Sequence, residues 1–358
     1  MKKVGLVTIY DDMNFGNRLQ NYALQYVLET NFNVKVVTLV ADCQMQLVSM
    51  IKAYTLSILS KLPFGFKRSP MDYRWDAFMK FTRRYIKTKI FWGKDRIPES
   101  ISDKYDVFIT GSDQVWNYNL PVVRNHEDDY FLCFAESKKK NSYSASFGVD
   151  FLKEEWLENY QMRLRTFKNL SVREQAGQRI VSELIGKTAS LNMDPTLLLT
   201  KEEWQAIEKR PNTYKKDQSY LLIYFLGDGI SREDINSIAL SRNLKVIDLL
   251  DDTADEYISG PSEFIYWIRN ADLVCTDSFH ATVFSIIFEK PFIVVSRQGM
   301  NSRIETLLKT FKLEDRYIRT ERIEETDYNQ ICDYNYIHEL IAHEKMSSMN
   351  YLKQLLII

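Results

Sequence analysis

The chain has few cysteines, almost no net charge and no long apolar run, and each of these absences excludes a class of protein. Its 358 residues include four cysteines that are far apart, with neither a C-x-x-C pair nor zinc-finger spacing. We therefore expect reduced thiols in a cytoplasmic protein. Lys plus Arg number 47 against 48 for Asp plus Glu, so the summed charge gives no long-range attraction to nucleic acid, and no nucleic-acid partner is expected.

No stretch reaches the ~18 apolar residues that a membrane-spanning helix needs. The N-terminus has a basic start and a brief apolar run, but it continues directly into Asp11 and Asp12, which indicates a first strand rather than a signal peptide. The sequence shows no metal-ligand cluster, so we expect neither a metal nor a bound cofactor. Hydrophobic residues make up 45% and charged residues 27%, which is typical of a globular chain and not of a disordered one.

Strand-like runs alternate with helix-like runs, which is the pattern of parallel sheets joined by crossover helices. The chain is also too long for one ordinary core. We predict an α/β fold of two Rossmann-like domains, residues 1–190 and 191–358, divided near Asp194-Pro195-Thr196, where proline disfavours helix at the residue before it. A ligand cleft is expected between the carboxyl ends of the two sheets.

The expected elements follow from this alternation. Strands are predicted at residues 4–9, 34–40, 107–110 and 141–146 in the first half, and at 220–225, 245–249, 273–275 and 292–295 in the second half. Helices are predicted at residues 18–29, 232–241, 261–269, 281–288, 302–309 and 336–358.

A helical insertion at about residues 45–85 interrupts the alternation. Residues 45–68 crowd apolar side chains ahead of Lys67 and Arg68. One interpretation is a helix at the membrane interface, because apolar residues with basic flanks suit the headgroup boundary. That helix would hold the protein peripherally at the inner face of the cell membrane. The other interpretation, which we favour, is a helix packed over the first domain.

Three polar segments follow predicted strands, and the first is residues 14–25. Asn14, Gly16, Asn17 and Gln20 lie where a strand turns into a helix. Free backbone N–H groups and amide side chains can face a polyoxygenated or phosphorylated ligand there. The segment lacks a full G-x-G-x-x-G motif, and a capped helix start is the alternative interpretation.

The second segment is residues 111–117. Glycine permits a sharp exit from the sheet, Asp113, Gln114 and Asn117 offer hydrogen bonds, and Trp116 offers a flat apolar face. This combination suits a carbohydrate, which has polar edges and C–H faces. The alternative is a turn held by an Asx hydrogen bond, with Trp116 filling the core.

The third segment is residues 272–282, where an apolar strand ends and His280 precedes a helix. His280 would lie at the carboxyl edge of a sheet beside a helix N-terminus, and an imidazole is suited to proton transfer. A lone histidine is more often structural, but this position favours function.

Taken together, these segments resemble the polysaccharide pyruvyltransferase family. The resemblance spans residues 4–310. It implies a fold similar to the two-domain GT-B glycosyltransferases and phosphoenolpyruvate as the donor. The implied product is a cyclic pyruvate ketal on a sugar of a cell-wall, capsule or exopolysaccharide precursor, often a lipid-linked oligosaccharide. The blocks that carry the resemblance are Asn14-Phe15-Gly16-Asn17, residues 111–117, residues 144–148, Ser171-Val172-Arg173-Glu174, Asp194-Pro195-Thr196 and Ser278-Phe279-His280.

The resemblance also implies roles for residues. His280 is the expected acid or base, and Arg173 matches a position that binds the donor. The family commonly shows Arg-x-His where this chain has Ser278-Phe279-His280, so Ser278 stands in place of a second donor-binding arginine. Arg303, at the next helix start, is our candidate replacement, and Arg297 is a second one. The loops at residues 14–21 and 111–117 would orient the acceptor sugar.

Two other functions remain open. A glycosyltransferase could place the diphosphate of a nucleotide sugar in the same cleft, against His280 and the loop at residues 14–21. A non-catalytic binding protein of a polysaccharide assembly complex is the other alternative, and the serine at position 278 favours it.

Overall fold

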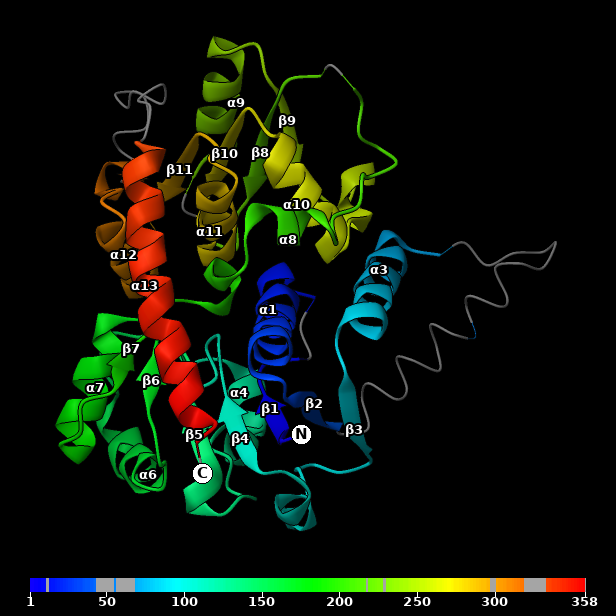
Figure 1. Cartoon of the computed structure of the whole chain (residues 1–358). Helices are drawn as coiled ribbons and strands as arrows, with labels where there is room; N and C mark the ends of the chain where they lie inside the picture. Colours follow the sequence, from blue (N-terminus) through cyan, green and yellow to red (C-terminus); the bar gives the residue numbers. More distant parts are fainter. Residues whose placement is uncertain are drawn as a thin grey trace.

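The computed structural model describes residues 1–10, 13–42, 55, 68–216, 218–227, 230–296, 301–318 and 333–357. Two five-stranded sheets dominate the described part, and each is wholly parallel. Figure 1 shows one sheet in the lower half and the other in the upper half, with helices on both faces. Their central strands are buried throughout, as in parallel sheets covered on both sides.

The first sheet has the strand order β3-β2-β1-β4-β5. Its strands are β1 (Lys3–Val7), β2 (Lys35–Asp42), β3 (Thr88–Trp92), β4 (Val107–Thr110) and β5 (Lys140–Ser142). Ala145 makes isolated bridges to Asp113 and Val172, which link this sheet to a two-stranded one. That small sheet consists of β6 (Ser171–Val172) and β7 (Ser190–Leu191).

The second sheet has the order β12-β11-β10-β8-β9. Its strands are β8 (Tyr220–Tyr224), β9 (Lys245–Asp248), β10 (Leu273–Thr276), β11 (Phe292–Val295) and β12 (Tyr317–Ile318). The predicted strands at residues 107–110 and 292–295 are confirmed residue for residue. The strand predicted at 141–146 ends at Ser142, because Ser144 adopts a left-handed backbone (φ 50°) that extended strands do not contain.

The helices cover the sheet faces and connect successive strands. They are α1 (Phe15–Phe32), α3 (Pro70–Tyr85), α4 (Pro121–Asn125), α5 (Glu127–Tyr130), α6 (Glu154–Leu164), α7 (Gln175–Ile185), α8 (Lys201–Gln205), α9 (Arg232–Ser241), α10 (Pro261–Asn270), α11 (Phe279–Ile287), α12 (Ser302–Thr310) and α13 (Tyr334–Leu355). The 3₁₀ helices are η1 (Glu99–Lys104), η2 (Ser137–Lys139), η3 (Pro195–Leu198), η4 (Asp255–Ile258) and η5 (Glu314–Arg316).

The helical insertion is described in its second part only. α3 confirms a helix within the range 45–85, and a capping box on Ser69 with proline in the first turn explains its start. The remainder of the predicted insertion helix, with its membrane-interface interpretation, lies outside the described residues except for Thr55. None of the described helices is both long and apolar enough to cross a membrane.

The C-terminal helix α13 joins the two halves of the molecule. Figure 1 shows it descending from the upper half to the lower half, where the chain ends. Near its start, the Tyr334 hydroxyl donates to the Lys290 carbonyl at 3.2 Å, and near its end the Tyr351 hydroxyl donates to the Ser142 carbonyl at 3.0 Å. β7 is the last strand of the first half and β8 the first of the second, while the division at residue 190 stays a prediction.

Candidate functional site

A cleft of about 540 Å³ lies at the carboxyl ends of strands from both sheets. Loops after β1 and β4 form one wall, and the loop after β10 with the starts of α11 and α12 forms the other. This is the place where α/β folds usually bind ligands. The cleft is lined by Ile9, Asn14, Asn17, Asp113, Gln114, Leu120, Pro121, Val122, Leu226, Asp277, Ser278, Phe279, His280 and Arg303.

Two long helices begin at this cleft. Asn14 caps α1 by accepting a hydrogen bond from the Asn17 backbone at 3.4 Å, and Ser278 caps α11 by accepting one from the Ala281 backbone at 3.5 Å. Neither helix carries an acidic residue in its first turn. Their positive dipole ends are therefore not offset by acidic side chains of that turn and favour an anionic ligand.

Arg303 brings a guanidinium to the same wall. It is the second residue of α12, is largely buried, and lines the cleft beside Ser278 and Phe279. The candidate replacement arginine thus lines the same cleft as Ser278, and its guanidinium lies 6.0 Å from the centroid of the Phe279 ring. Arg297, the second candidate, lies outside the described residues.

His280 lies in the first turn of α11, so the helix begins before this residue and not after it as predicted. Its side chain is 7% exposed and lines the cleft. A Cβ atom on Gly16 would lie 1.9 Å from the His280 Nδ1 atom. Gly16 therefore does not present a side chain to a ligand, and its bare backbone is what lets the imidazole pack against the start of α1.

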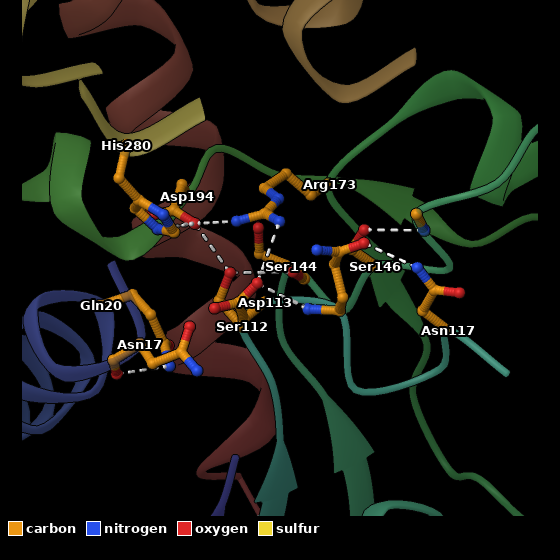
Figure 2. Close-up of polar contacts among 12 residues, drawn as sticks. Asn17, Gln20, Ser112, Asp113, Asn117, Ser144, Ser146, Arg173, Asp194 and His280 are labelled. Carbon is orange, nitrogen blue, oxygen red and sulfur yellow. Dashed lines mark hydrogen bonds and ion pairs between the residues drawn. The ribbon is translucent and has the colours of Figure 1, made fainter. Parts of the chain in front are cut away.

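Asp194 joins His280 to Arg173, as Figure 2 shows. Its Oδ2 atom lies 2.5 Å from Arg173 Nη1, 3.7 Å from His280 Nε2 and 2.9 Å from the Ser112 hydroxyl, which donates to it. Its Oδ1 atom accepts from the Thr196 backbone and hydroxyl at 3.0 and 2.6 Å. One buried carboxylate is shared by two basic side chains.

The environment of Asp194 fixes its charge. Burial favours the neutral acid, but the charges of His280 and Arg173 and the Thr196 hydroxyl outweigh burial and hold the pKa of Asp194 well below its usual range. The carboxylate is therefore ionised at every pH at which the protein would work, and it is the buried counter-charge of Arg173.

Arg173 does not line the cleft. Its side chain is 2% exposed, with Nη2 3.6 Å from Asp113 Oδ1 and the guanidinium 4.2 Å from the centroid of the Phe279 ring. It lines a smaller cavity of about 40 Å³, and Phe279 and Arg303 form the wall shared by the two spaces. Asp194 and Asp113 engage the guanidinium, and the direct donor contact of Arg173 stays a prediction.

Glu174, the neighbour of Arg173, holds the loop at residues 146–148 behind the cleft by hydrogen bonds. Its Oε1 atom accepts hydrogen bonds from the Ser146 hydroxyl at 3.0 Å and the Phe147 backbone at 2.9 Å. Burial raises the pKa of Glu174, although Arg173 opposes that shift. A Cβ on Gly148 in this loop would lie 2.2 Å from the Gln114 side-chain oxygen, so the loop backs Gln114 closely.

The residues predicted to bind the acceptor separate into two groups. Asn14, Asn17, Asp113 and Gln114 line the cleft. Gln20, Trp116 and Asn117 do not. The Gln20 amide donates to the Thr8 hydroxyl at 2.8 Å in the interior, and the Asn117 amide donates to Gln114 Oε1 at 2.7 Å.

Trp116 fills the core of the first half, as the alternative interpretation of its segment proposed. It is 0% exposed, and its ring stacks on Phe131 with centroids 5.7 Å apart and packs against Phe147. The turn after β4 directs this large apolar ring inward, where burial is favourable. Its place in the site is to support the wall that carries Asp113 and Gln114.

Reasoning from the sequence missed Asp194, Asp277 and Phe279 as parts of the site. Asp277 lines the cleft and accepts from the Leu226 backbone at 2.7 Å. In the sequence, Asp194 marks the predicted domain boundary and belongs to a block of the family resemblance, but it is not among the predicted site residues, although Asp-Pro-Thr is a typical Asx start of a 3₁₀ turn. Its contacts with Arg173 and His280 join residues distant in the sequence, and no local pattern reports them. Among the described residues, no group of three or more His, Cys, Asp or Glu could hold a metal ion.

Comparisons with known proteins agree with this architecture. A family model described as polysaccharide pyruvyl transferase matches residues 14–299. The UDP-GlcNAc 2-epimerase from Neisseria meningitidis, bound to UDP-GlcNAc, is 10% identical with a TM-score of 0.51, covering 99% of this chain and 100% of that chain. The UDP-N-acetylglucosamine 2-epimerase from Rickettsia bellii is 11% identical with a TM-score of 0.51, covering 99% and 98%. The search of curated proteins found no match.

At these identities the solved structures show the fold alone. The predicted fold class, two Rossmann-like domains of the GT-B type, is confirmed.

Proposed function

Because the chain belongs to the polysaccharide pyruvyl transferase family, we propose that its cleft binds phosphoenolpyruvate and transfers the pyruvyl group to two hydroxyls of a sugar, as a ketal, with release of phosphate. The acceptor is a unit of a cell-surface polysaccharide, such as a capsule or exopolysaccharide, or its lipid-linked precursor. Four cysteines without a paired motif suit a cytoplasmic setting, in which thiols stay reduced.

The donor carries a phosphate and a carboxylate, and the positive groups of the cleft suit such an anion. The N-termini of α1 and α11 offer backbone N–H groups, and Arg303 offers paired donors that match a planar or tetrahedral oxyanion. Asp113 lines the opposite wall, so we place the sugar there and the anionic donor against the α11 and Arg303 side, where the Asp277 carboxylate accepts from the Leu226 backbone.

His280 is the proton carrier of the proposed reaction. Its imidazolium gives a proton to the methylene carbon of phosphoenolpyruvate, and positive charge develops at C2. A sugar hydroxyl adds to C2 and returns its proton to His280, and a second hydroxyl then displaces phosphate, which takes the second proton. The atoms balance, since one hydroxyl proton ends on the new methyl group and the other leaves with phosphate.

Asp194 supports this step from behind the imidazole. Its carboxylate lies 3.7 Å from His280 Nε2, on the side of the ring away from Gly16. Arg173 holds that carboxylate in place and lies over the Phe279 ring, which is part of the cleft wall.

The acceptor sugar would lie along the wall formed by Asn14, Asn17, Asp113 and Gln114. Amides donate and accept, whereas a carboxylate only accepts, so together they can pair with hydroxyl groups in either sense. The packed loop behind Gln114 holds that amide in one orientation, which favours recognition of a defined pair of hydroxyls.

The observation that carries the proposal is that His280 and Arg303 line one cleft although position 278 is a serine. Thermal-shift measurements test it. Phosphoenolpyruvate at about 100 times its dissociation constant should stabilise the protein by roughly 2.7 kcal/mol, and Arg303→Ala should abolish most of the shift. Arg179→Ala, which removes an exposed arginine of α7, is the matched control and should keep it.

The same assay separates the competing function. UDP-GlcNAc, which one of the similar structures binds, should give a much smaller shift than phosphoenolpyruvate. A shift with the nucleotide sugar that depends on Arg303, and none with phosphoenolpyruvate, would instead indicate a glycosyltransferase.

A further inference from the structure

A second cavity of about 550 Å³ lies apart from the cleft, between α3 and the chain around residues 206–213, against the start of α10. Figure 1 places α3 beside α1 and below α10. The volume is within the ~300–1,000 Å³ typical of small-molecule sites. Its charged and aromatic lining consists of Arg68, Tyr73, Asp76, Lys80, Phe81, Arg84, Tyr85, Glu208, Lys209 and Glu263.

Each acid of this lining already has a cation. Asp76 pairs with Arg68 at 2.6 Å, and Glu263 pairs with Lys209 at 2.6 Å. Glu208 accepts two hydrogen bonds from Arg269, which lies outside the lining, at 2.7 Å each. These three acids are therefore already paired, and they do not neutralise the other cations of the cavity lining.

Two cations remain. Lys80 and Arg84 are exposed, lie one helical turn apart on the same face of α3, and form no ion pair with the described residues. An anion that enters the cavity meets two charges that other side chains have not neutralised. Arg84 lies over the Tyr85 ring, 5.3 Å from its centroid, which holds its guanidinium at the cavity wall.

The remaining lining suits a sugar. The Tyr73 side chain is 47% exposed, and an aromatic ring offers a flat apolar face to the C–H surface of a pyranose. The paired carboxylates keep unused lone pairs that can accept from sugar hydroxyls. An anionic lipid surface fits less well, because lipid-binding patches are clusters of basic residues, whereas this concave site mixes its basic residues with Asp76, Glu208 and Glu263.

We infer that this cavity is a glycan-binding site that holds an acidic segment of the polysaccharide, one bearing uronate or phosphate groups, while the cleft acts on another part of the same polymer. The inference rests on the proposed function in one respect, namely that a polysaccharide is the acceptor. Lys80 and Arg84 bind the negative groups, and the aromatic side chains contact the sugar rings.

A packed aromatic cluster connects this cavity to the cleft. Phe15, which directly follows Asn14 of the cleft wall, stacks on Phe78 of α3 and on Phe264 of α10, with centroids 5.2 and 4.4 Å apart. α3 also approaches the start of α10 closely, since a Cβ on Gly260 would lie 2.9 Å from the Ala77 Cβ. The two sites are therefore held in a fixed relation, and a polymer bound at one is presented to the other.

Titration calorimetry with a defined probe tests the inference. Tetragalacturonate should bind the full chain, with an affinity that falls as salt rises, and uncharged maltotetraose should bind much more weakly. Lys80→Glu with Arg84→Glu should weaken tetragalacturonate binding by about tenfold or more. The control pair Arg179→Glu and Lys187→Glu changes two exposed cations outside the cavity and should leave binding intact. The neutral pair Lys80→Gln and Arg84→Gln repeats the test if charge reversal disturbs folding.

The outcomes distinguish this site from the cleft. Phosphoenolpyruvate should stabilise the Lys80 and Arg84 variants as it does the unaltered chain, and Arg303→Ala should still bind the glycan. Unchanged tetragalacturonate binding in the double variant, loss of binding in Arg303→Ala, or a preference for phosphatidylserine vesicles over the glycan would overturn the inference. Failure of phosphoenolpyruvate to bind, with glycan binding retained, would reject the proposed reaction and leave this site standing.

Discussion

Asp194 is the residue on which the geometry of the site depends, because its carboxylate contacts both Arg173 and His280. We predict that Asp194→Asn lowers the free energy of unfolding at pH 7 by about 3–5 kcal/mol, since removing one partner leaves the buried Arg173 without its main counter-charge. Turnover should fall as well, because His280 loses the carboxylate that lies 3.7 Å from its Nε2 atom. Chemical unfolding and steady-state rates measure the two effects. A stable, fully active variant would contradict this account of Asp194.

The stability difference between the unaltered chain and Asp194→Asn should depend on pH, because folding lowers the pKa of Asp194. A carboxyl group whose pKa is depressed on folding contributes stability above its unfolded pKa of about 3.9, and this contribution is lost as the pH falls toward the lower folded value. The stability difference between the unaltered chain and Asp194→Asn should therefore be full at pH 7 and shrink below about pH 4. Urea titrations of both proteins at pH 7 and below about pH 4 check this. A stability difference that is the same at both pH values would refute it.

Gly16 matters because it has no side chain. In Gly16→Ala the new Cβ would overlap the His280 ring, so the imidazole must move or α1 must shift. We expect a large loss of activity while the protein stays folded. Gly177→Ala is the matched control, because the new Cβ at that buried helical glycine would meet Val172 at 3.2 Å, a much smaller overlap that does not involve His280. Equal activity in the two variants would show that the His280 position is not critical.

His280 should be the residue whose loss costs most in rate. We predict that His280→Ala folds normally and loses about 10²- to 10⁴-fold in ketal formation, which is the usual contribution of general acid or base catalysis. His343→Ala, which removes a histidine that is 74% exposed on α13, should behave like the unaltered chain. Retained turnover in the folded His280 variant would remove its proposed role.

At the residue scale, the sequence predicts the site residues that reach the cleft because they follow a strand or begin a helix. Asn14, Asn17, Asp113, Ser278 and His280 follow directly on strand ends or start helices, and such positions face the cleft of an α/β fold. Trp116 has a similar position, but its size and apolarity direct it inward. Asp194 and Phe279 take part through side-chain contacts across the fold, and no local pattern encodes these contacts.

At the scale of elements, the starts of α11 and α12 together form the cleft wall that we assign to the donor. Ser278 begins α11 where the family commonly has an arginine, and Arg303 supplies a guanidinium from α12 to the same wall. We predict that Ser278→Arg restores phosphoenolpyruvate binding to Arg303→Ala, at a cost of about 1 kcal/mol in stability for the lost helix cap. Thermal shift with the donor measures the recovery.

A lysine provides the control for this exchange. Ser278→Lys in the Arg303→Ala background should restore less binding, because an ammonium cannot reproduce the paired hydrogen bonds of a guanidinium. If neither substitution restores any binding, Arg303 is not the replacement for the missing arginine.

The elements themselves were predictable where the pattern was long and strong. The predicted helix 232–241 matches α9, and the four strands predicted in the second half match β8 to β11 within two residues at each end. The two-residue strands β6, β7 and β12 were missed, because two residues show no periodicity. β3 was also missed, since its two polar residues are followed by three apolar ones without the alternation that indicates a strand.

At the scale of the whole molecule, α13 holds the two halves together. Leu352 is fully buried on this helix, in the core cluster that also contains residues of both sheets. We predict that Leu352→Ala lowers the unfolding free energy by about 2–5 kcal/mol, whereas Met346→Ala, which truncates a side chain 61% exposed on the same helix, changes it by less than about 0.5 kcal/mol. Thermal unfolding compares them, and equal effects would show that α13 is only loosely attached.

The central claim is that the cleft between the two sheets seats phosphoenolpyruvate with His280 beside its methylene carbon. A crystal structure of the chain soaked with phosphoenolpyruvate tests this most directly. The account predicts the phosphate at the start of α11 next to Arg303, and the methylene carbon facing the imidazole of His280. Donor bound in the cavity beside α3, or no donor in the cleft at a saturating concentration, would contradict it.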